Sequence, residues 1–271
     1  MKHKGIILLS TIMVFVLATT LSFVWLLKIR HVEISVVAEA TEEIDTYQKV
    51  SSIIDANYKG KSFFGVKEGD VIAKLSQDPY LNVKSVTKVF PDRLKIDVAK
   101  RKERFAILYN EEYFVTDSEY YLLKKVPESS QLEEGIIQIT LKEISLNVST
   151  LVLGQKIGAE NDALVGYMTE IFAKFSDGLN LIENVTVMGV KNWIRFNTKT
   201  GVVIEFSFAP SSAVATGGIN PNEASALVEK TSEVENVYNS LTETQKRSGY
   251  LLVYTKATEE IAIEHVIEHA E

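Results

Sequence analysis

The sequence predicts an α+β protein: an N-terminal transmembrane helix, a β-α-α-β-β unit, and then a mixed β unit with two helices. Three observations support this fold class. An uncharged apolar run extends from Gly5 to Leu27. Short stretches of alternating apolar and polar residues follow it, and segments with apolar residues at helical spacing lie between those stretches. With 271 residues, 46% of them hydrophobic, the chain is long enough for two small domains.

The apolar run from Gly5 to Leu27 predicts an uncleaved signal anchor. It is longer than the ~7–15 apolar residues of a secretory signal, and about 20 such residues span a bilayer. It ends in Phe23 and Trp25, followed by Lys28, which is typical of a membrane interface. Cleavage near Ala18 is the alternative interpretation.

The charges that flank the run set its orientation only weakly. Lys2 and Lys4 precede it, whereas Lys28 and Arg30 follow it, so the positive-inside count is nearly tied. Short basic N-termini usually remain inside. We therefore expect residues 1–4 to be a cytoplasmic tail, residues 5–27 to be the transmembrane helix, and the folded part to lie outside the cytoplasm.

The composition excludes several classes of site. The chain has no cysteine, which excludes disulfides, thiolate catalysis and iron–sulfur clusters. Its formal net charge is −7, and no run rich in Lys or Arg stands out, so we expect no nucleic-acid partner. A histidine-based centre would have to use His3, His31, His265 or His269.

The first unit is predicted to begin directly after the anchor. Residues 31–39 alternate as a strand, Thr41 offers the N-cap of a helix that Gly60 stops, and a shorter helix is expected at 70–75. Two more strands flank Phe90-Pro91-Asp92. The side chains expected to contribute to a buried sheet face are Val86, Phe90, Leu94, Ile96 and Val98.

The second unit is predicted to be a series of strands interrupted by two helices. The first helix, at about 161–175, is expected to end at Gly178. The second is expected to be long, from its N-cap Asn220 until Gly249 stops it. The loop between Ala209 and Ile219 is expected to be mobile. The strands are expected at residues 104–109, 113–117, 120–127, 135–139, 183–189, 193–198, 201–208 and 250–256.

Several short motifs of the first unit resemble the POTRA domain of the FtsQ/DivIB family of bacterial cell-division proteins. In chain order these motifs are Gly60-Lys61-Ser62-Phe63, Leu75 with Pro79, Phe90-Pro91, and Leu94 to Val98 followed by Arg101. Lys100 and Glu103 stand where the family usually has Glu and Pro, which is typical of a divergent member. Further along, Leu153-Gly154-Gln155 ahead of a helix resembles an element of the family's β domain.

The resemblance implies a domain organisation and a function. It implies a POTRA domain at 31–101, a β domain at 102–257 and a C-terminal tail at 258–271. A protein of this kind is a single-pass scaffold of the cytoplasmic membrane that acts at the septum. Its implied partners are FtsB-like and FtsL-like proteins and other divisome components, with no cofactor. The alternatives are a POTRA-containing envelope scaffold or secretion and assembly factor, and a wall-acting serine acyltransferase.

Two sets of residues imitate catalytic motifs. Ser85-Val-Thr-Lys88, Ser145-Leu-Asn147 and Lys199-Thr-Gly201 imitate elements of penicillin-recognising enzymes, but Ser85 and Lys88 are expected on opposite faces of a strand. His265-Val-Ile-Glu-His269 imitates an inverted zinc-protease motif, and we expect a charged terminal helix there instead. We therefore expect no catalytic, cofactor-binding or metal-binding residues and no enzymatic activity.

The resemblance also implies a partner site on a late strand, because in the family such a strand takes up an extended segment of FtsB. The matching residues are Tyr250, Leu251, Leu252, Val253, Tyr254, Thr255 and Lys256. This segment is rich in β-forming residues and has no proline and a single charge, as expected for an edge kept open for strand addition. The alternative is a central strand, or one covered by residues 259–270 folding back, with Ile261 to Ile263 pairing there.

Overall fold

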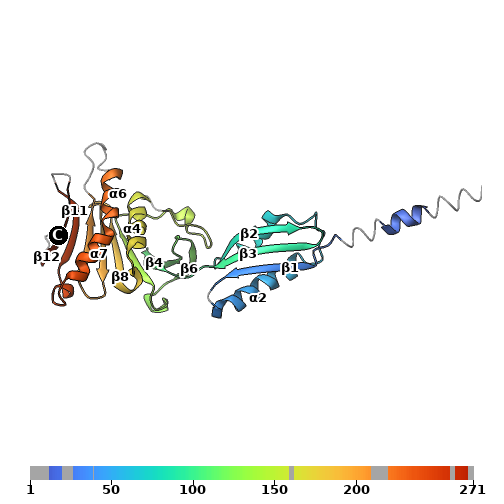
Figure 1. The fold of residues 1–271 in the computed structure, drawn as a ribbon, viewed down its shortest axis with the longest axis horizontal. Helices are drawn as coiled ribbons and strands as arrows, with labels where there is room; N and C mark the ends of the chain where they lie inside the picture. The colour runs from blue at the N-terminus through green and yellow to red at the C-terminus, as the bar shows by residue number, and fades with distance from the viewer. Residues whose placement is uncertain are drawn as a thin grey trace, which may run out of the picture. The chain divides into compact units, whose positions relative to one another are not determined.

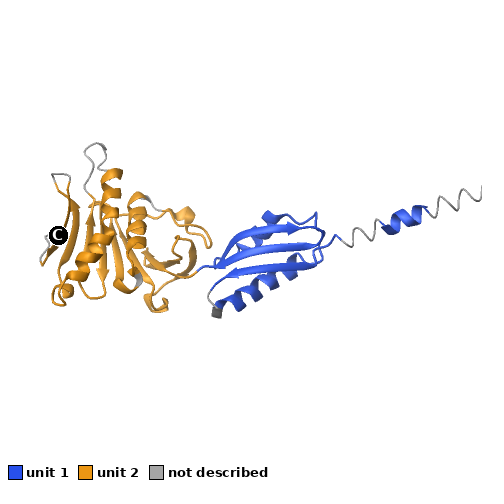
Figure 2. Ribbon diagram, viewed as in Figure 1, with its two compact units in different colours: residues 1–101 blue, residues 102–271 orange. Residues whose placement is uncertain are grey.

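The computed structural model describes residues 12–19, 27–38, 40–158, 162–208, 219–256 and 260–267. The chain divides into two compact units, Met1–Arg101 and Lys102–Glu271, here called unit 1 and unit 2 (Figure 2). Each unit has its own sheet and its own hydrophobic core. Almost all of the predicted mobile loop lies outside the described residues.

The predicted transmembrane segment also lies mostly outside the described residues. Within it, residues 12–19 are helical and Leu27 belongs to the described part of unit 1. Among the helices described, none has both the length and the apolar character needed to cross a membrane.

Unit 1 has the predicted β-α-α-β-β order (Figure 1). Its central strand β3 pairs parallel with β1 and antiparallel with β2. The β2–β3 pair is a hairpin, whereas the parallel β1–β3 pair needs the long crossover that the two helices provide. The elements are β1 (His31–Val37), α2 (Ala40–Asn57), α3 (Glu68–Leu75), β2 (Leu81–Val89) and β3 (Arg93–Lys100).

The core of unit 1 lies between the sheet and the two helices. Leu94, Ile96 and Val98 alternate with more exposed residues along β3, so one face of this strand is buried. Residues of both helices pack on that face, including Val50, Ile54, Val71 and Leu75. The prediction of a buried apolar face on β3 is therefore confirmed.

Phe90 is a correction to the predicted core, because 64% of its surface is exposed. It follows the last residue of β2 and lies in the turn before β3, beyond the paired part of the sheet. Phe63 takes the buried place beneath it, with 6% exposure and its ring centroid 6.0 Å from that of Phe90.

Unit 2 contains a nine-stranded sheet in the order β12-β11-β10-β9-β8-β7-β4-β5-β6. The pairs β4–β7, β7–β8 and β10–β11 are parallel. The others are antiparallel, including the β4–β5 hairpin, whose turn residues Asn110 and Glu111 both have positive φ, as a type I′ turn requires. The strands are β4 (Phe105–Tyr109), β5 (Glu112–Thr116), β6 (Leu122–Val126), β7 (Ile137–Lys142), β8 (Ile182–Met188), β9 (Trp193–Thr198), β10 (Val203–Ser207), β11 (Tyr250–Thr255) and β12 (Ile261–Val266).

Helices cover one face of the central strands of this sheet (Figure 1). They are α4 (Asp162–Lys174), α5 (Gly178–Leu181), α6 (Pro221–Glu229) and α7 (Thr231–Ser240). Their buried side chains form one core with those of the strands, including Met168, Leu227, Val234, Phe196, Phe206 and Val253. Burial of this apolar surface is the main term that stabilises unit 2.

The helices of unit 2 differ from the prediction in three respects. The expected long helix is interrupted at Lys230, which ends α6 and precedes α7, and whose N–H donates to the carbonyl of Leu227. It ends at Ser240, because Thr242 and Gln245 form a reciprocal capping box that begins a separate 3₁₀ turn. Gly178 opens the short helix α5, whereas α4 already ends at Lys174.

Candidate interaction edge

Residues Tyr250–Thr255 of the predicted partner segment form strand β11, and Lys256 follows it. This strand is not an edge strand. It pairs with β10 on one side and with β12 on the other. The structure therefore has the alternative arrangement, in which residues 261–263 pair with this segment. The expectation of a free edge at β11 is corrected, and partner binding by its residues remains a prediction.

The two faces of β11 have different surroundings. Leu251 and Val253 are fully buried in the core beneath the helices. Tyr250, Leu252 and Tyr254 are half-buried on the opposite face. Any contact of this strand with a partner is therefore limited to the second face, which we call the open face.

An ion pair lies on the open face next to β11. The Arg195 Nε lies 2.6 Å from the Glu205 Oε2 in a pair that is largely shielded from solvent. The guanidinium of Arg195 also lies 3.9 Å from the ring centroid of Trp193 and 5.3 Å from that of Tyr250. These contacts hold the aromatic rings of β9 and β11 in a fixed arrangement beside the end of the sheet.

The edge of the sheet at this end is β12. Lys256 N donates to Glu260 O across the β11–β12 pair, at 2.8 Å. Because bonded pairs alternate in an antiparallel ladder, Ala262 and Glu264 also direct their backbone groups toward β11. Ile261, Ile263 and His265 then direct their N–H and C=O groups outward, so β12 presents a ladder to which another strand can bond.

The side chains of β12 leave this ladder accessible. Ile261 and Ile263 pack against the core, and the strand has no lysine and no proline. Glu264, on the open face, lies 3.3 Å from Lys256. Partial burial, and the nearby Glu264 carboxylate, raise the pKa of the Tyr254 hydroxyl. Apart from Glu264, the residues of β12 include no carboxylate, lysine or arginine.

Residues 258–271 were expected to be a tail with a charged terminal helix, and this expectation is corrected, because β12 has the alternative arrangement in which residues 261–263 pair with the partner segment. The alternation in Ile261-Ala-Ile-Glu-His-Val266 is the signal that predicts a strand. His265 lies in this strand, and His269 lies outside the described residues. In the described ranges no three His, Cys, Asp or Glu side chains gather as a metal site would require.

The geometry of Ser85 and Lys88 does not fit an acyl-enzyme site. The Ser85 hydroxyl donates to Asp97 Oδ2 at 2.5 Å. The Lys88 ammonium donates to the carbonyl oxygens of Phe63 and Val66, at 3.1 and 2.8 Å. The lysine is thus engaged away from the hydroxyl that it would have to deprotonate.

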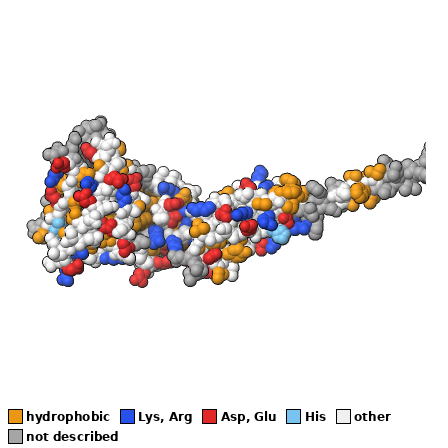
Figure 3. Space-filling model, viewed as in Figure 1, with side chains coloured by type: hydrophobic (Ala, Val, Ile, Leu, Met, Phe, Trp, Pro, Cys, Tyr) orange, Lys and Arg blue, Asp and Glu red, His pale blue; other side chains and the backbone are white. Residues whose placement is uncertain are grey.

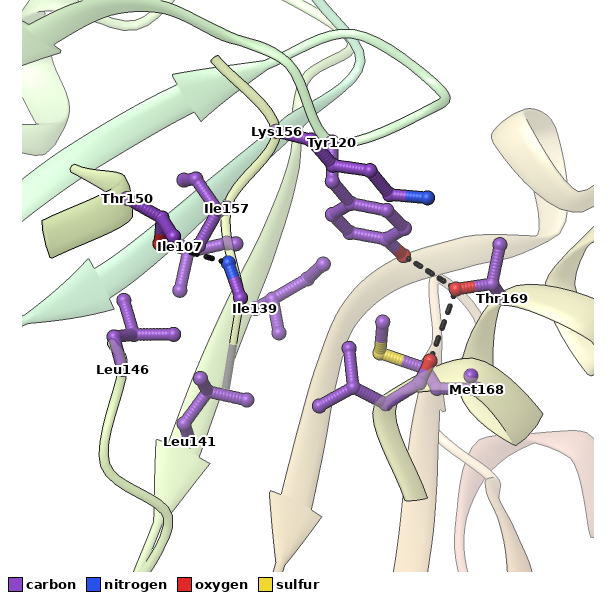
Figure 4. A pocket seen from close by; sticks show the side chains of 13 residues that line it. Ile107, Tyr120, Ile139, Leu141, Leu146, Thr150, Lys156, Ile157, Met168 and Thr169 are labelled. Carbon is purple, nitrogen blue, oxygen red and sulfur yellow. Dashed lines mark hydrogen bonds between the residues drawn. The ribbon is translucent and has the colours of Figure 1, made fainter. Parts of the chain in front are cut away.

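A cavity of about 400 Å³ lies in unit 2 between α4, β4, β7 and the segment before α4 (Figure 4). Its walls are mainly aliphatic. Its polar side chains are Tyr120, Thr150, Lys156 and Thr169, and the Tyr120 hydroxyl lies 3.2 Å from the hydroxyl of Thr169. Burial raises the pKa of Tyr120 to about 12. The described lining has no carboxylate or histidine that could act as a general base.

Comparison with known proteins identifies unit 1. Residues 27–101 match the family model of the POTRA domain, FtsQ-type. Residues 27–101 of unit 1 are an FtsQ-type POTRA domain. The match supports the resemblance to the FtsQ/DivIB family, and it includes all the motifs of the first unit on which that resemblance rested. POTRA domains are typically scaffold modules without catalytic activity. A search of curated proteins found no match to the chain.

Proposed function

We propose that the chain is a single-pass division scaffold that binds other membrane division proteins outside the cytoplasm and connects divisome assembly to septal wall synthesis. The observation that carries this proposal is the FtsQ-type POTRA domain at residues 27–101. The apolar run at 5–27 supplies the anchor and residues 1–4 the cytoplasmic tail. Residues 102–257 then form the β domain, to which β12 adds one more strand.

Strand addition to β12 is the contact that unit 2 supports best. An extended segment of an FtsB-like protein would bond to the outward N–H and C=O groups of Ile261, Ile263 and His265. Residues of the predicted partner segment contribute from the open face, where Tyr250, Leu252 and Tyr254 lie beside β12. An FtsL-like protein would join through its association with the FtsB-like chain.

The topology of this proposal is tested by a reporter that is active only outside the cytoplasm, fused after Glu271. The uncharged run and the absence of a good cleavage site lead us to expect an active, membrane-retained fusion. Release of a processed soluble form, or activity of a cytoplasmic reporter at the same position, would contradict the anchor or its orientation.

The partner contact is tested by a proline in β12. In Ile263→Pro the outward N–H is lost while the bonds between β11 and β12 are kept, because Ile263 does not donate to β11. Ile263→Val is the matched control, since it keeps the N–H and most of the side chain. The full-length variants are co-expressed with the FtsB-like and FtsL-like proteins of the same cell and purified in detergent.

We expect Ile263→Pro to reduce recovery of the FtsB-like protein at least ~10-fold, which is about 1.4 kcal/mol of binding free energy. Ile263→Val should bind as the parent does. Equal recovery with the proline variant would place the partner contact elsewhere. If a fluorescent fusion is distributed around the whole envelope instead of at the septum, the broader envelope-scaffold function is favoured over division.

A further inference from the structure

One end of the POTRA domain exposes aromatic side chains. Phe64 and Phe90 are 67% and 64% exposed, and Val89, adjacent to Phe90, is 41% exposed. We call Phe64, Val89 and Phe90 the aromatic tip. Figure 3 shows hydrophobic side chains gathered at this end of unit 1. Exposed apolar side chains that occur singly are ordinary, but a group of this kind marks a surface that contacts something apolar.

The aromatic tip is held in place by the domain. The ring of Phe63 is buried, and its centroid lies 5.6 Å from that of Phe64 and 6.0 Å from that of Phe90, with both pairs edge to face. Lys88 lies over the Phe63 ring at 5.0 Å and donates to two carbonyls of the same loop. The rings of Phe64 and Phe90 therefore pack against a buried ring, and the loop that carries Phe63 and Phe64 is hydrogen-bonded to Lys88 of β2.

The chain enters the domain beside the aromatic tip. Phe63 N donates to Leu27 O at 2.7 Å, Ile29 N to Lys61 O at 2.9 Å, and Gly60 N to Ile29 O at 2.8 Å. Leu27 and Ile29 are buried, at 8% and 0% exposure. Leu27 is thus both the last residue of the apolar run and a built-in part of the POTRA domain, so no linker separates the two.

This connection limits how far Leu27, and the loop bonded to it, can lie from a bilayer. Trp25, expected at the membrane interface, is two residues before Leu27, and two residues reach at most about 7 Å. The head-group layer on each side of the hydrocarbon core is of similar thickness, about 5–8 Å. A domain that starts at Leu27 therefore has this end within the head-group layer when the apolar run that precedes Leu27 spans the membrane.

The charges around the aromatic tip suit an anionic surface. Lys61 and Lys67 are exposed, and Lys28, Arg30 and Lys88 are partly exposed at the same end. Acids also lie near this end: Glu68 accepts from Lys88 N, Asp92 lies 3.5 Å from His31, and Asp55 lies 3.0 Å from Lys59. Asp70, in the first turn of α3, is exposed. Basic side chains next to exposed aromatic rings are the pattern of a segment that lies in a membrane interface.

We propose that the aromatic tip of the POTRA domain inserts into the head-group layer of an anionic lipid bilayer and fixes the orientation of the domain on the membrane. The proposal rests on the membrane anchor of the proposed function. It assigns to Phe64 and Phe90 a role in lipid contact, and to the lysines around them attraction to anionic lipid. A protein partner covering the same residues is the competing outcome.

The chain has no cysteine, so single labels can be placed without removing native ones. The full chain is reconstituted in vesicles of phosphatidylcholine with phosphatidylglycerol. One variant, Gly65→Cys, carries a fluorophore next to Phe64, where a Cβ meets only ordinary contacts with Ser62. The matched label, Glu43→Cys, is exposed in the first turn of α2, at the other end of β1 from the tip (Figure 1). Brominated lipids quench a label that touches the bilayer.

We expect brominated lipid to quench the label at residue 65 and not the label at residue 43, with less quenching when phosphatidylglycerol is omitted. Phe64→Ser should lower the ratio of bilayer-contacting to water-facing tips about tenfold, because it removes most of an aromatic side chain that the bilayer would otherwise bury. Val37→Ser, an equally exposed apolar residue at the far end of β1, should leave the ratio unchanged.

Failure of this proposal can be told from failure of the proposed function by an alkaline carbonate wash. Protein that stays in the vesicles while the residue 65 label is not quenched overturns the aromatic tip and leaves the anchor standing. Protein released by the wash overturns both. Loss of quenching at residue 65 when an FtsL-like protein is co-reconstituted would assign the tip to a protein partner and overturn the lipid contact.

Discussion

The two edges of the nine-stranded sheet in unit 2 differ in how they are protected. At the β6 edge, the segment before α4 bonds to the strand: Leu122 N donates to Gln155 O at 2.9 Å, and Gly154 N donates to Leu122 O at 2.7 Å. The same strand has two lysines, Lys124 and Lys125. At the β12 edge, the described residues include neither such a covering segment nor a lysine on the strand.

This difference indicates which edge is available to a partner. Proteins usually block sheet edges with lysine, proline, bulges or a covering loop, because an unblocked edge pairs with other chains. Unit 2 has both lysines and a covering segment at β6, so this protein does protect one of its two sheet edges. Their absence along described β12 is consistent with strand addition there, and four experiments test the contrast.

The largest effect is expected from breaking the ion pair beside the open edge. Arg195→Met removes the guanidinium partner of the buried Glu205 carboxylate, and loss of one partner of such a pair typically costs about 3–5 kcal/mol. Hydrogen exchange should show weaker protection across β9 to β12 and unchanged protection at β6. The double variant Arg195→Met/Glu205→Leu should recover most of the protection, and uniform loss in both regions would show that the two edges do not open separately.

The β6 edge should have its own pH dependence through Tyr120, whose backbone carbonyl accepts from Ile157 in the covering segment. Its pKa is about 12 in the folded protein and about 10 in the unfolded chain. Below pH 10 the tyrosine is protonated in both states. Between pH 10 and pH 12 the unfolded chain loses this proton first, so stability falls as pH rises, by about 3 kcal/mol. Chemical denaturation from pH 8 to pH 12 measures this loss.

Tyr120→Phe is the control for this pH dependence. It should flatten the decline between pH 10 and pH 12 although it loses the hydroxyl contact with Thr169. An equally steep decline in the variant would mean that other groups are responsible.

A smaller effect is expected from straining the segment that covers β6. Gly154 has a φ of 78°, which favours glycine, so Gly154→Ala should cost about 1 kcal/mol. We expect faster hydrogen exchange at the Leu122 amide. Gly135→Ala is the matched control, because Gly135 has a similar φ of 86° and open space around it but no bond to β6. If both variants expose Leu122 equally, the effect is general destabilisation and not loss of the cover.

The smallest effect on stability is expected when the open edge is made to resemble the protected one. Glu264→Lys places a lysine on β12 and removes an exposed ion pair, which costs at most about 1 kcal/mol. Binding of the FtsB-like protein, measured by titration, should nevertheless weaken several-fold. Glu264→Gln separates loss of the carboxylate from gain of the lysine, and a Glu264→Lys variant that binds as tightly as the parent would show that edge charge does not control access.

Local patterns predicted most of the secondary structure, because strand alternation and helix spacing are properties of adjacent residues. Leu94, Ile96 and Val98 alternate as expected and are buried. The break at Lys230 was missed, because no glycine or proline between Asn222 and Ser240 marks it in the sequence. Phe90 was wrongly predicted to be buried. Its apolar side chain favours burial, but Phe63 already fills the core beneath it, and this cannot be predicted from Phe90 alone.

The sequence by itself determined the apolar run, the β-α-α-β-β order of the POTRA domain and the strand at Tyr250–Thr255. Only the tertiary structure decided that β12 lies outside β11 and that Leu27 is built into the domain beside Phe64 and Phe90. Periodicity assigns each strand two faces, but it does not assign neighbours, since pairing is made by backbone groups that every residue carries. Which edge is open is therefore decided by how segments far apart in the chain compete for the same ladder.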